Sequence, residues 1–407
     1  MAEQSSAQIR AARTSDRQEV VLLNWNKASD TVLNGKGAWF NGGRPTQLLI
    51  QSTFSKGEWK RPSNFTFTNW KLNGSIRILG VGSSASDAVR QSSFRRGHTE
   101  RMQAAAPTGI TLSGLTIKAD EKIPLILGPG VNNVTLRDST LAGTSQSVAI
   151  YLDAESAYNT IADNTFTIKA DRELIAVDGS KGNQISGNTF KNLPWGGVYV
   201  YRNCGERGVV RHQKPTHNQI TDNIFDLSTL KSFWEKNPKN GRQLEYRHGI
   251  WLGSREGSRA PDYCGEDKGY PFGSSISNGD FADDNIVSGN RRIGSNKGYL
   301  LKLSEDLGIG GYDKFIKDDG TNNQIQSNRA FDARPRRLSA APSAGDGRAS
   351  GLTRTGTVSA PVTASIASPA PMPVVRNPLA RPGALEQHCG CSSPQDFRPG
   401  LSTPAVA

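Results

Sequence analysis

The chain has 407 residues, 43 of them glycine, and only 35% are hydrophobic, which is typical of a turn-rich β protein rather than a helical one. A formal charge of +12 at pH 7 favours acidic partners. No apolar run approaches the roughly 20 residues that a membrane-spanning helix needs, which argues against a membrane span. Lysine and arginine are scattered and mixed with acids, whereas nucleic-acid binders gather them into one stripe, so we expect no nucleic-acid partner.

The first predicted segment, residues 1–16, is polar and is expected to be disordered. It lacks the apolar stretch of a secretory signal, so the sequence shows no export signal.

Residues 17–332 repeat a short pattern. Copies such as "NTIADNTFTI" at Asn159, "NQISGNTF" at Asn183 and "NQITDNIF" at Asn218 give a base period of about 24 residues, with insertions in some copies. A second strand-like series runs between them with the same period: "PLILG", "AIYLD", "IAVDG", "VYVYR", "GIWLG" and "LLKLS". Short β segments repeated at this spacing cannot bury a face singly and must stack on one another.

On these motifs the chain resembles the right-handed parallel β-helix proteins of the pectate-lyase-like superfamily. The resemblance implies an all-β domain over residues 17–332, a right-handed single-stranded parallel β-helix. It implies no single activity, because lyases, hydrolases, epimerases and non-enzymatic adhesins share that fold.

One asparagine recurs at the same place in the repeat. We expect it to form a ladder at a turn, since asparagine tolerates the left-handed conformation and can hydrogen-bond to its copies in adjacent coils. The positions are Asn164, Asn188, Asn223, Asn290 and Asn328.

Strand alternation in the second series predicts two outward columns, with neighbouring coils about 4.8 Å apart. The first column runs Arg77, Ile126, Tyr151, Ala176, Tyr199, Trp251 and Lys302. The second runs Gly128, Asp153, Asp178, Tyr201, Gly253 and Ser304. Exposed aromatic rings beside carboxylates and hydroxyls are typical of sugar binding, so Tyr151, Tyr199 and Trp251 are predicted to contact substrate, with Lys302 and the nearby Arg255. The alternative is that the long insertions cover these residues.

Three insertions, residues 203–217, 226–248 and 253–280, are expected to leave the coils at one location and to bring arginine and histidine over this face. A disulfide between Cys204 and Cys264 would fasten two of them and would imply an oxidising compartment. Two buried thiols in a cytosolic protein are the alternative.

Two reactions fit these residues. In β-elimination on a uronic-acid polymer, Arg202, Arg211 or Arg255 would neutralise the carboxylate, His212 or His248 would be the base and Tyr201 the acid. In glycoside hydrolysis, Asp153 and Asp178 would be the two carboxylates. The same pair could instead hold Ca²⁺ or merely cap turns.

The leading hypothesis is a polysaccharide lyase acting on an acidic, uronic-acid polysaccharide. The alternatives are a glycoside hydrolase, a non-catalytic carbohydrate-binding or surface protein, and a purely structural solenoid. Such a protein is expected to be a monomer and to be secreted or periplasmic, although a cytoplasmic location stays open.

After residue 332 the composition changes. Residues 333–407 are rich in proline, alanine, serine and arginine without periodicity, and we expect a disordered basic tail.

Overall fold

The computed structural model describes residues 2–3, 11–13, 18–84, 86–202, 208–230, 247–253, 269–276, 282–294 and 315–330. The chain divides into residues 1–336 and residues 337–407, and the second unit lies outside the described residues. The tail predicted to be disordered, residues 333–407, therefore also lies outside them. Two short strands fall within residues 1–16, which the sequence predicts to be disordered.

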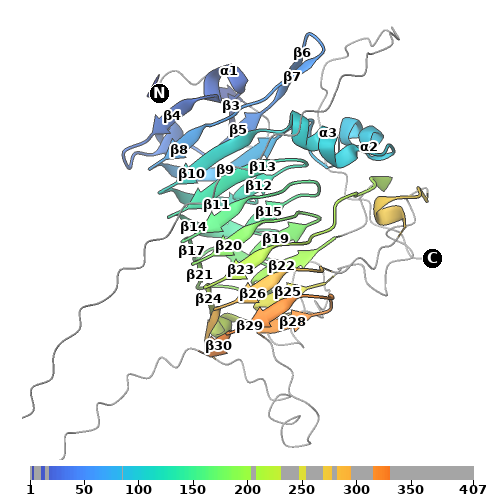
Figure 1. The fold of residues 1–407 in the computed structure, drawn as a ribbon. Coiled ribbons are helices and arrows are strands. Elements are labelled where there is room, and N and C mark those ends of the chain that lie inside the picture. The colour runs from blue at the N-terminus through green and yellow to red at the C-terminus, as the bar shows by residue number, and fades with distance from the viewer. Residues whose placement is uncertain are drawn as a thin grey trace, which may run out of the picture. The chain divides into compact units, whose positions relative to one another are not determined.

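Three sheets make up the fold, and apart from one antiparallel pair near the N-terminus each strand pairs in parallel with its equivalent in the next coil (Figure 1). Sheet A contains β1 (Ala2–Glu3), β4 (Thr31–Asn34), β8 (Thr66–Thr68), β10 (Thr108–Ser113), β13 (Asn132–Arg137), β16 (Thr160–Ala162), β20 (Gln184–Ser186), β23 (Gln219–Thr221), β26 (Ile286–Ser288) and β29 (Gln324–Gln326). Sheet B contains β2 (Ala11–Arg13), β3 (Glu19–Leu23), β5 (Thr46–Gln51), β9 (Lys71–Leu79), β12 (Leu125–Leu127), β15 (Ile150–Leu152), β19 (Ile175–Asp178), β22 (Val198–Tyr201), β25 (Ile250–Leu252) and β28 (Ile316–Asp318).

Sheet C contains the first residues of β9, then β11 (Thr116–Glu121), β14 (Thr140–Ser145), β17 (Thr165–Phe166), β18 (Lys169–Ala170), β21 (Thr189–Phe190), β24 (Ile224–Asp226), β27 (Arg291–Ile293) and β30 (Arg329–Ala330). An antiparallel hairpin, β6 (Thr53–Ser55) and β7 (Glu58–Lys60), stands apart from the three sheets. Each coil passes through sheets A, C and B in turn and then returns to sheet A. The all-β, parallel β-helix expectation is confirmed.

The core fills the space between the three sheets because alternate side chains of every strand point inward. In sheet B the inward residues stack coil upon coil, as in the run Leu127, Leu152, Val177, Val200 and Leu252, all fully buried. On sheet C the rings of Phe166, Phe190 and Phe225 stack at centroid separations of 4.7 and 4.6 Å. Residues at equivalent positions of successive coils therefore pack on one another, and each repeated position of the sequence forms a column in the core.

The predicted asparagine ladder is present between sheets A and C. Asn164 Nδ2 donates to Asn188 Oδ1 at 3.0 Å, and Asn188 Nδ2 donates to Asn223 Oδ1 at 2.9 Å. The left-handed backbone, however, belongs to the residue before each asparagine, such as Asp163 with φ 55°. The expectation that asparagine itself would take that conformation was wrong, because the amide hydrogen-bonds across coils instead of shaping the turn.

A second, parallel ladder lies between sheets B and A, and the sequence-based prediction missed it. Its members are joined in the same way, each side-chain amide donating to the next: Asn159, Asn183, Asn218, Asn285 and Asn323.

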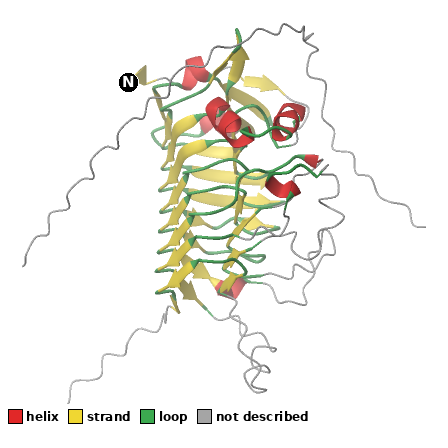
Figure 2. Cartoon of the chain, turned by 45° about the vertical axis from the view of Figure 1, so that its right-hand side comes forward, coloured by secondary structure: helices red, strands yellow, loops and turns green. Residues whose placement is uncertain are grey.

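Two helices fill the return from sheet B to sheet A after β9, α2 (Asp87–Ser93) and α3 (His98–Ala105), and Figure 2 shows helices beside the column of strands. Ser86 caps the N-terminus of α2, because its side chain accepts from the Val89 amide at 3.4 Å. The shorter helices are α1 (Trp25–Ala28), η2 (Phe40–Gly43), η4 (Leu227–Thr229) and η7 (Gly273–Ser275).

The insertions leave the coils at two corners rather than at one location. Residues 202–218 and 253–285 follow strands of sheet B, whereas residues 227–249 precede β25. The described parts of the first two meet, since the Arg211 amide donates to Ser274 Oγ at 3.0 Å. α2 joins them, because the Val210 amide donates to Ser93 Oγ at 3.0 Å.

Candidate functional site

The candidate site lies on the outer face of sheet B, which we define as the side chains that alternate with the core residues. The strand register gives the first outward column as Leu49, Arg77, Ile126, Tyr151, Ala176, Tyr199, Trp251 and Lys317. Lys317 on β28 thus occupies the position predicted for Lys302, which lies outside the described residues. Asp319 likewise takes the position predicted for Ser304, because the strand that pairs with β25 in the next coil of sheet B is β28.

The prediction that the aromatic column is exposed was wrong for two of its three members. Tyr199 and Trp251 are each only 2% exposed, and Tyr151 alone is partly exposed. The rings cover one another: Tyr199 meets Trp251 edge-on at 5.4 Å, and Tyr201 lies 6.1 Å from Trp251. These residues form a second, smaller apolar cluster outside sheet B.

Trp251 is fixed further by a hydrogen bond from its indole Nε1 to Asp319 Oδ2 at 2.8 Å. Lys317 Nζ reaches the same carboxylate oxygen at 2.9 Å.

Asp178 is the last residue of β19, and Asp153 directly follows β15. Arg211, in the insertion after β22, lies against both carboxylates. Arg211 Nη1 lies 2.5 Å from Asp178 Oδ2, and Nη2 lies 4.0 Å from Asp153 Oδ1. Tyr151 Oη donates to Asp178 Oδ2 at 2.7 Å. The structure therefore brings these four side chains together, and Asp153, Asp178 and Arg211 are buried there.

The two carboxylates have different surroundings. Burial raises the pKa of Asp153 to about 6, although the positive charge of the nearby Arg211 guanidinium acts to lower that pKa. Burial lowers the pKa of Arg211, but the charges of Asp178, Tyr151 and Asp153 and the hydrogen bond to Asp178 together outweigh burial and hold that pKa well above its ordinary value. Burial and the Asp178 charge also raise the pKa of Tyr151 well above its usual range, so its hydroxyl stays a donor.

Tyr201, predicted to be the acid of an elimination, is fully buried and belongs to a separate network. Its Oη donates to Glu173 Oε1 at 2.8 Å, and Arg172 Nη2 reaches Tyr201 Oη and Glu173 Oε1, each at 3.1 Å. Sequence reasoning missed Arg172 and Glu173 because they precede β19 in a turn and fall in neither column.

The segment that carries Arg211 is fastened at several points. Glu155 Oε1 accepts from the His212 amide at 2.7 Å, and its other oxygen accepts from Thr99 Oγ1 of α3. Arg202 Nη1 donates to the main-chain oxygens of Arg211 and His212 at 3.2 and 3.4 Å. Sequence reasoning also missed Glu155, whose buried carboxylate joins α3 to this segment.

The two histidines predicted as bases lie apart. His212 Nε2 lies 2.8 Å from Ser93 O of α2, beyond the ends of the sheet-B strands. His248 precedes β25 at the opposite end of these strands, where its amide donates to Tyr199 Oη at 3.1 Å and its side chain is buried. The expectation that His212 and His248 share one site was wrong, because the insertion before β25 starts from the other corner.

Several predicted residues lie outside the described residues: Cys204, Cys264, Arg255 and Lys302. Their roles, including the disulfide, remain predictions. For Ca²⁺, the donor set does not fit, because the Arg211 guanidinium already lies against both carboxylates. Within the described ranges no group of three metal-ligating side chains occurs.

A family profile described as "Right handed beta helix region" matches residues 76–254, the coils that carry this site. The chain is a right-handed parallel β-helix repeat protein. No curated protein sequence is significantly similar to this β-helix protein.

Solved structures resemble the β-helix protein at low identity. A mutant tailspike protein of E. coli bacteriophage HK620 in complex with a pentasaccharide matches with 12% identity and a TM-score of 0.41, covering 77% of this chain. The match covers 49% of the tailspike chain, so the present chain spans about half its length. An endo-xylogalacturonan hydrolase from Aspergillus tubingensis matches with 13% identity and a TM-score of 0.36, covering 76% of this chain and 79% of that one. Identities this low say nothing about activity.

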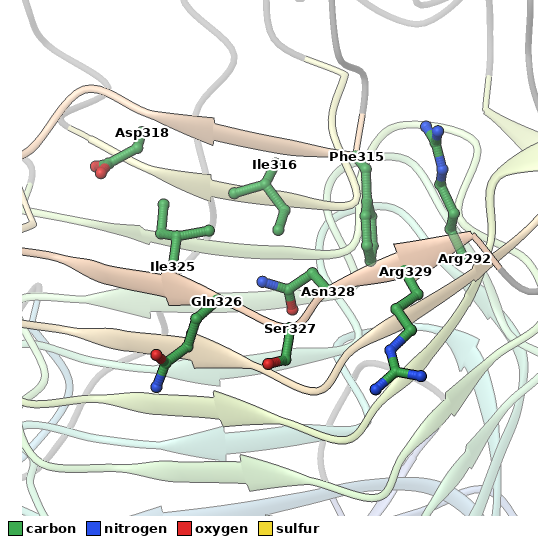
Figure 3. Close-up of a pocket in the computed structure, with 9 residues that line it drawn as sticks. All are labelled: Arg292, Phe315, Ile316, Asp318, Ile325, Gln326, Ser327, Asn328 and Arg329. Atoms are coloured by element: carbon green, nitrogen blue, oxygen red, sulfur yellow. The ribbon is translucent and has the colours of Figure 1, made fainter.

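Figure 3 shows a cavity of about 370 Å³ at the last coils of the β-helix. Its lining includes Phe315 and Ile316 of the β28 region and Ile325 of β29. Ile325 is 39% exposed, whereas Val287, its counterpart one coil earlier, is fully buried. The cavity thus marks the end of the described repeats and is not part of the outer face of sheet B. No helix among the described residues is long and apolar enough to cross a membrane.

Proposed function

We propose that the protein binds a polysaccharide along the outer face of sheet B. The observation that carries this proposal is Tyr151, whose ring is partly exposed on that face while its hydroxyl donates to buried Asp178. A tyrosine held by a buried acceptor keeps its ring in one orientation, and the apolar C–H face of a sugar stacks on such a ring. Ile126, partly exposed beside it in the column, extends the apolar contact.

The charge of the protein supports an acidic polysaccharide. The net charge of +12 raises the local concentration of anionic polymers, and Arg172 lies at this face with 32% of its side chain exposed. We also propose that the protein acts as a monomer, in the periplasm or outside the cell.

A second candidate function, glycoside hydrolysis, is favoured by the unequal surroundings of Asp153 and Asp178. One carboxyl with a raised pKa beside a second carboxyl that is paired with an arginine resembles the arrangement that acid catalysis of glycosidic cleavage uses. Asp153 would protonate the leaving oxygen and Asp178 would be the second carboxylate. Because both side chains are buried beneath residues 208–213, turnover requires that segment to move away.

Elimination receives less support. Arg211 is paired with Asp178, Arg202 donates to main-chain oxygens, and His212 contacts Ser93 O, so these three predicted groups are engaged within the protein. Tyr201 is bonded to Glu173 and is fully buried.

The test is a binding and cleavage screen with the full-length protein. Acidic and neutral polysaccharides would be tested by isothermal titration calorimetry, and each mixture would be assayed for new reducing ends and for the absorbance of unsaturated uronates. Binding without products supports the first proposal alone, and reducing ends without absorbance support hydrolysis. Absorbance would favour elimination, and the absence of binding to every polymer would contradict the proposal.

A further inference from the structure

Arg77 is a cation on the outer face of sheet B, and none of the described carboxylates forms an ion pair with it. It lies on β9 between the inward residues Ile76 and Ile78, which are fully buried, so its own side chain points outward. Its neighbours across the sheet are apolar, Leu49 on one side and Ile126 on the other. Among the described residues no side chain forms an ion pair or hydrogen bond with it, and its buried Nε has no partner.

The surroundings of Arg77 favour an anion. Burial lowers the pKa of this guanidinium, and no carboxylate in the described part of the chain offsets the effect. A partly buried arginine whose N–H groups lack acceptors gains hydrogen bonds and charge neutralisation when an oxyanion approaches. Carboxylate and sulfate both match the planar, forked donors of arginine.

Two glutamines flank this position. Gln47 and Gln51 lie on β5 two residues before and after Leu49, the neighbour of Arg77, and both point outward and are partly exposed. Strand spacing and rise put their Cα atoms roughly 8 Å from that of Arg77. No side-chain hydrogen bond to either amide is found within the described part of the chain. Amide groups beside a cation can bind the hydroxyls of the sugar that carries the anion.

We propose that Arg77, flanked by Gln47 and Gln51, is a subsite that binds the carboxylate or sulfate group of a polysaccharide. The proposal rests on the proposed function and names the group that confers specificity. Arg77 and Tyr151 are two coils apart in the same column, roughly 10 Å by strand spacing, so one extended oligosaccharide can reach both. Arg172 is less suited to this role because Glu173 already neutralises it.

The experiment compares polymers that differ only in the oxyanion. Wild-type protein and Arg77→Gln would be titrated with polygalacturonate and its methyl ester, and with chondroitin sulfate and unsulfated chondroitin. The variant is expected to bind the preferred charged polymer about tenfold or more weakly, in line with loss of a charge-assisted hydrogen bond. Binding to the polymer that lacks the recognised group, the methyl ester for carboxylate or unsulfated chondroitin for sulfate, should be unchanged. The carboxylate pair and the sulfate pair distinguish the two sources of the oxyanion.

Arg137→Gln is the matched control, because it removes the same charge from an exposed arginine of sheet A that pairs with Asp138. Arg77→Lys keeps the charge but loses the forked donors and should bind the charged polymer with intermediate affinity. A second readout is the Arg77 Nε–H resonance in NMR spectra, which should shift when a charged oligosaccharide is added.

The outcomes separate the two proposals. If wild-type protein binds no polymer, the proposed function fails and the subsite fails with it. If wild-type protein binds charged polymers while Arg77→Gln binds them equally well and the Nε–H resonance does not move, only the subsite is wrong. Equal losses of affinity in Arg77→Gln and Arg137→Gln would also overturn the subsite, because such losses would reflect only the lower net charge of the protein.

Discussion

Arg211 Nη1 lies 2.5 Å from Asp178 Oδ2 at a position where the two side chains are 3% and 0% exposed. This ion pair connects an insertion to a strand end of sheet B. Removing one partner of a buried pair leaves the other charge uncompensated.

Arg211→Met is therefore expected to lower the free energy of unfolding by about 3–5 kcal/mol, measured by urea denaturation. The control is Arg137→Met, which breaks the exposed pair with Asp138 and should cost less than about 1 kcal/mol. Similar small losses in both variants would show that the Arg211 pair does not fasten the segment.

Asp153 should make stability depend on pH. Because burial raises its folded-state pKa from 3.8 to about 6, the folded protein binds this proton more tightly than the unfolded chain. The stability that Asp153 contributes is fully present below about pH 4 and is lost as the pH rises through about 6.

Asp153→Asn cannot ionise, so its free energy of unfolding relative to wild type should increase by about 3 kcal/mol between those pH values. Denaturation curves at several pH values would measure this, with Asp138→Asn as a control that removes an exposed carboxyl. A difference that stays constant with pH would be incompatible with the raised pKa.

The asparagine ladder should carry measurable stability. Asn188 accepts from the main-chain and side-chain nitrogens of Asn164, both at 3.0 Å, and donates to Ile161 O and Asn223 Oδ1. Asn188→Ala leaves these buried groups without partners and should cost about 3 kcal/mol or more, because each lost partner costs roughly 1–3 kcal/mol. Asn328→Ala, at the partly exposed end of the ladder, should cost clearly less in the same urea titration.

The repeat made the fold predictable. Each coil buries equivalent residues against their copies, so the period of Leu127, Leu152 and Val177 in the sequence is the stacking of the core itself. The helices α2 and α3 could not be predicted from that period, because they lie in an insertion that the repeat does not constrain. For the same reason the neighbour of Trp251 in the outward column was misassigned. The sequence predicted Lys302 at this position, but Lys317 of β28 pairs with Trp251.

The site was predictable only in part. Alternation correctly put Tyr151, Asp153 and Asp178 on the outer side of sheet B, and a basic insertion correctly brought Arg211 to them. Burial was not predictable, because it depends on how the rings pack on one another and on residues far away in sequence, such as Thr99 of α3 against Glu155.

The most direct test of the polysaccharide-binding face is the affinity of Tyr151→Ala, measured by calorimetry with a polysaccharide that the wild-type protein binds. Tyr151→Phe keeps the ring but loses the hydroxyl bond to Asp178, so its affinity should lie between those of wild type and Tyr151→Ala. Tyr158→Ala removes a tyrosine that is 55% exposed at the turn after sheet B and is the control. We predict that Tyr151→Ala binds about tenfold or more weakly, a change of about 1.4 kcal/mol, while Tyr158→Ala stays within about twofold of wild type. Unchanged binding by Tyr151→Ala would contradict the proposal that sugars bind on the outer face of sheet B.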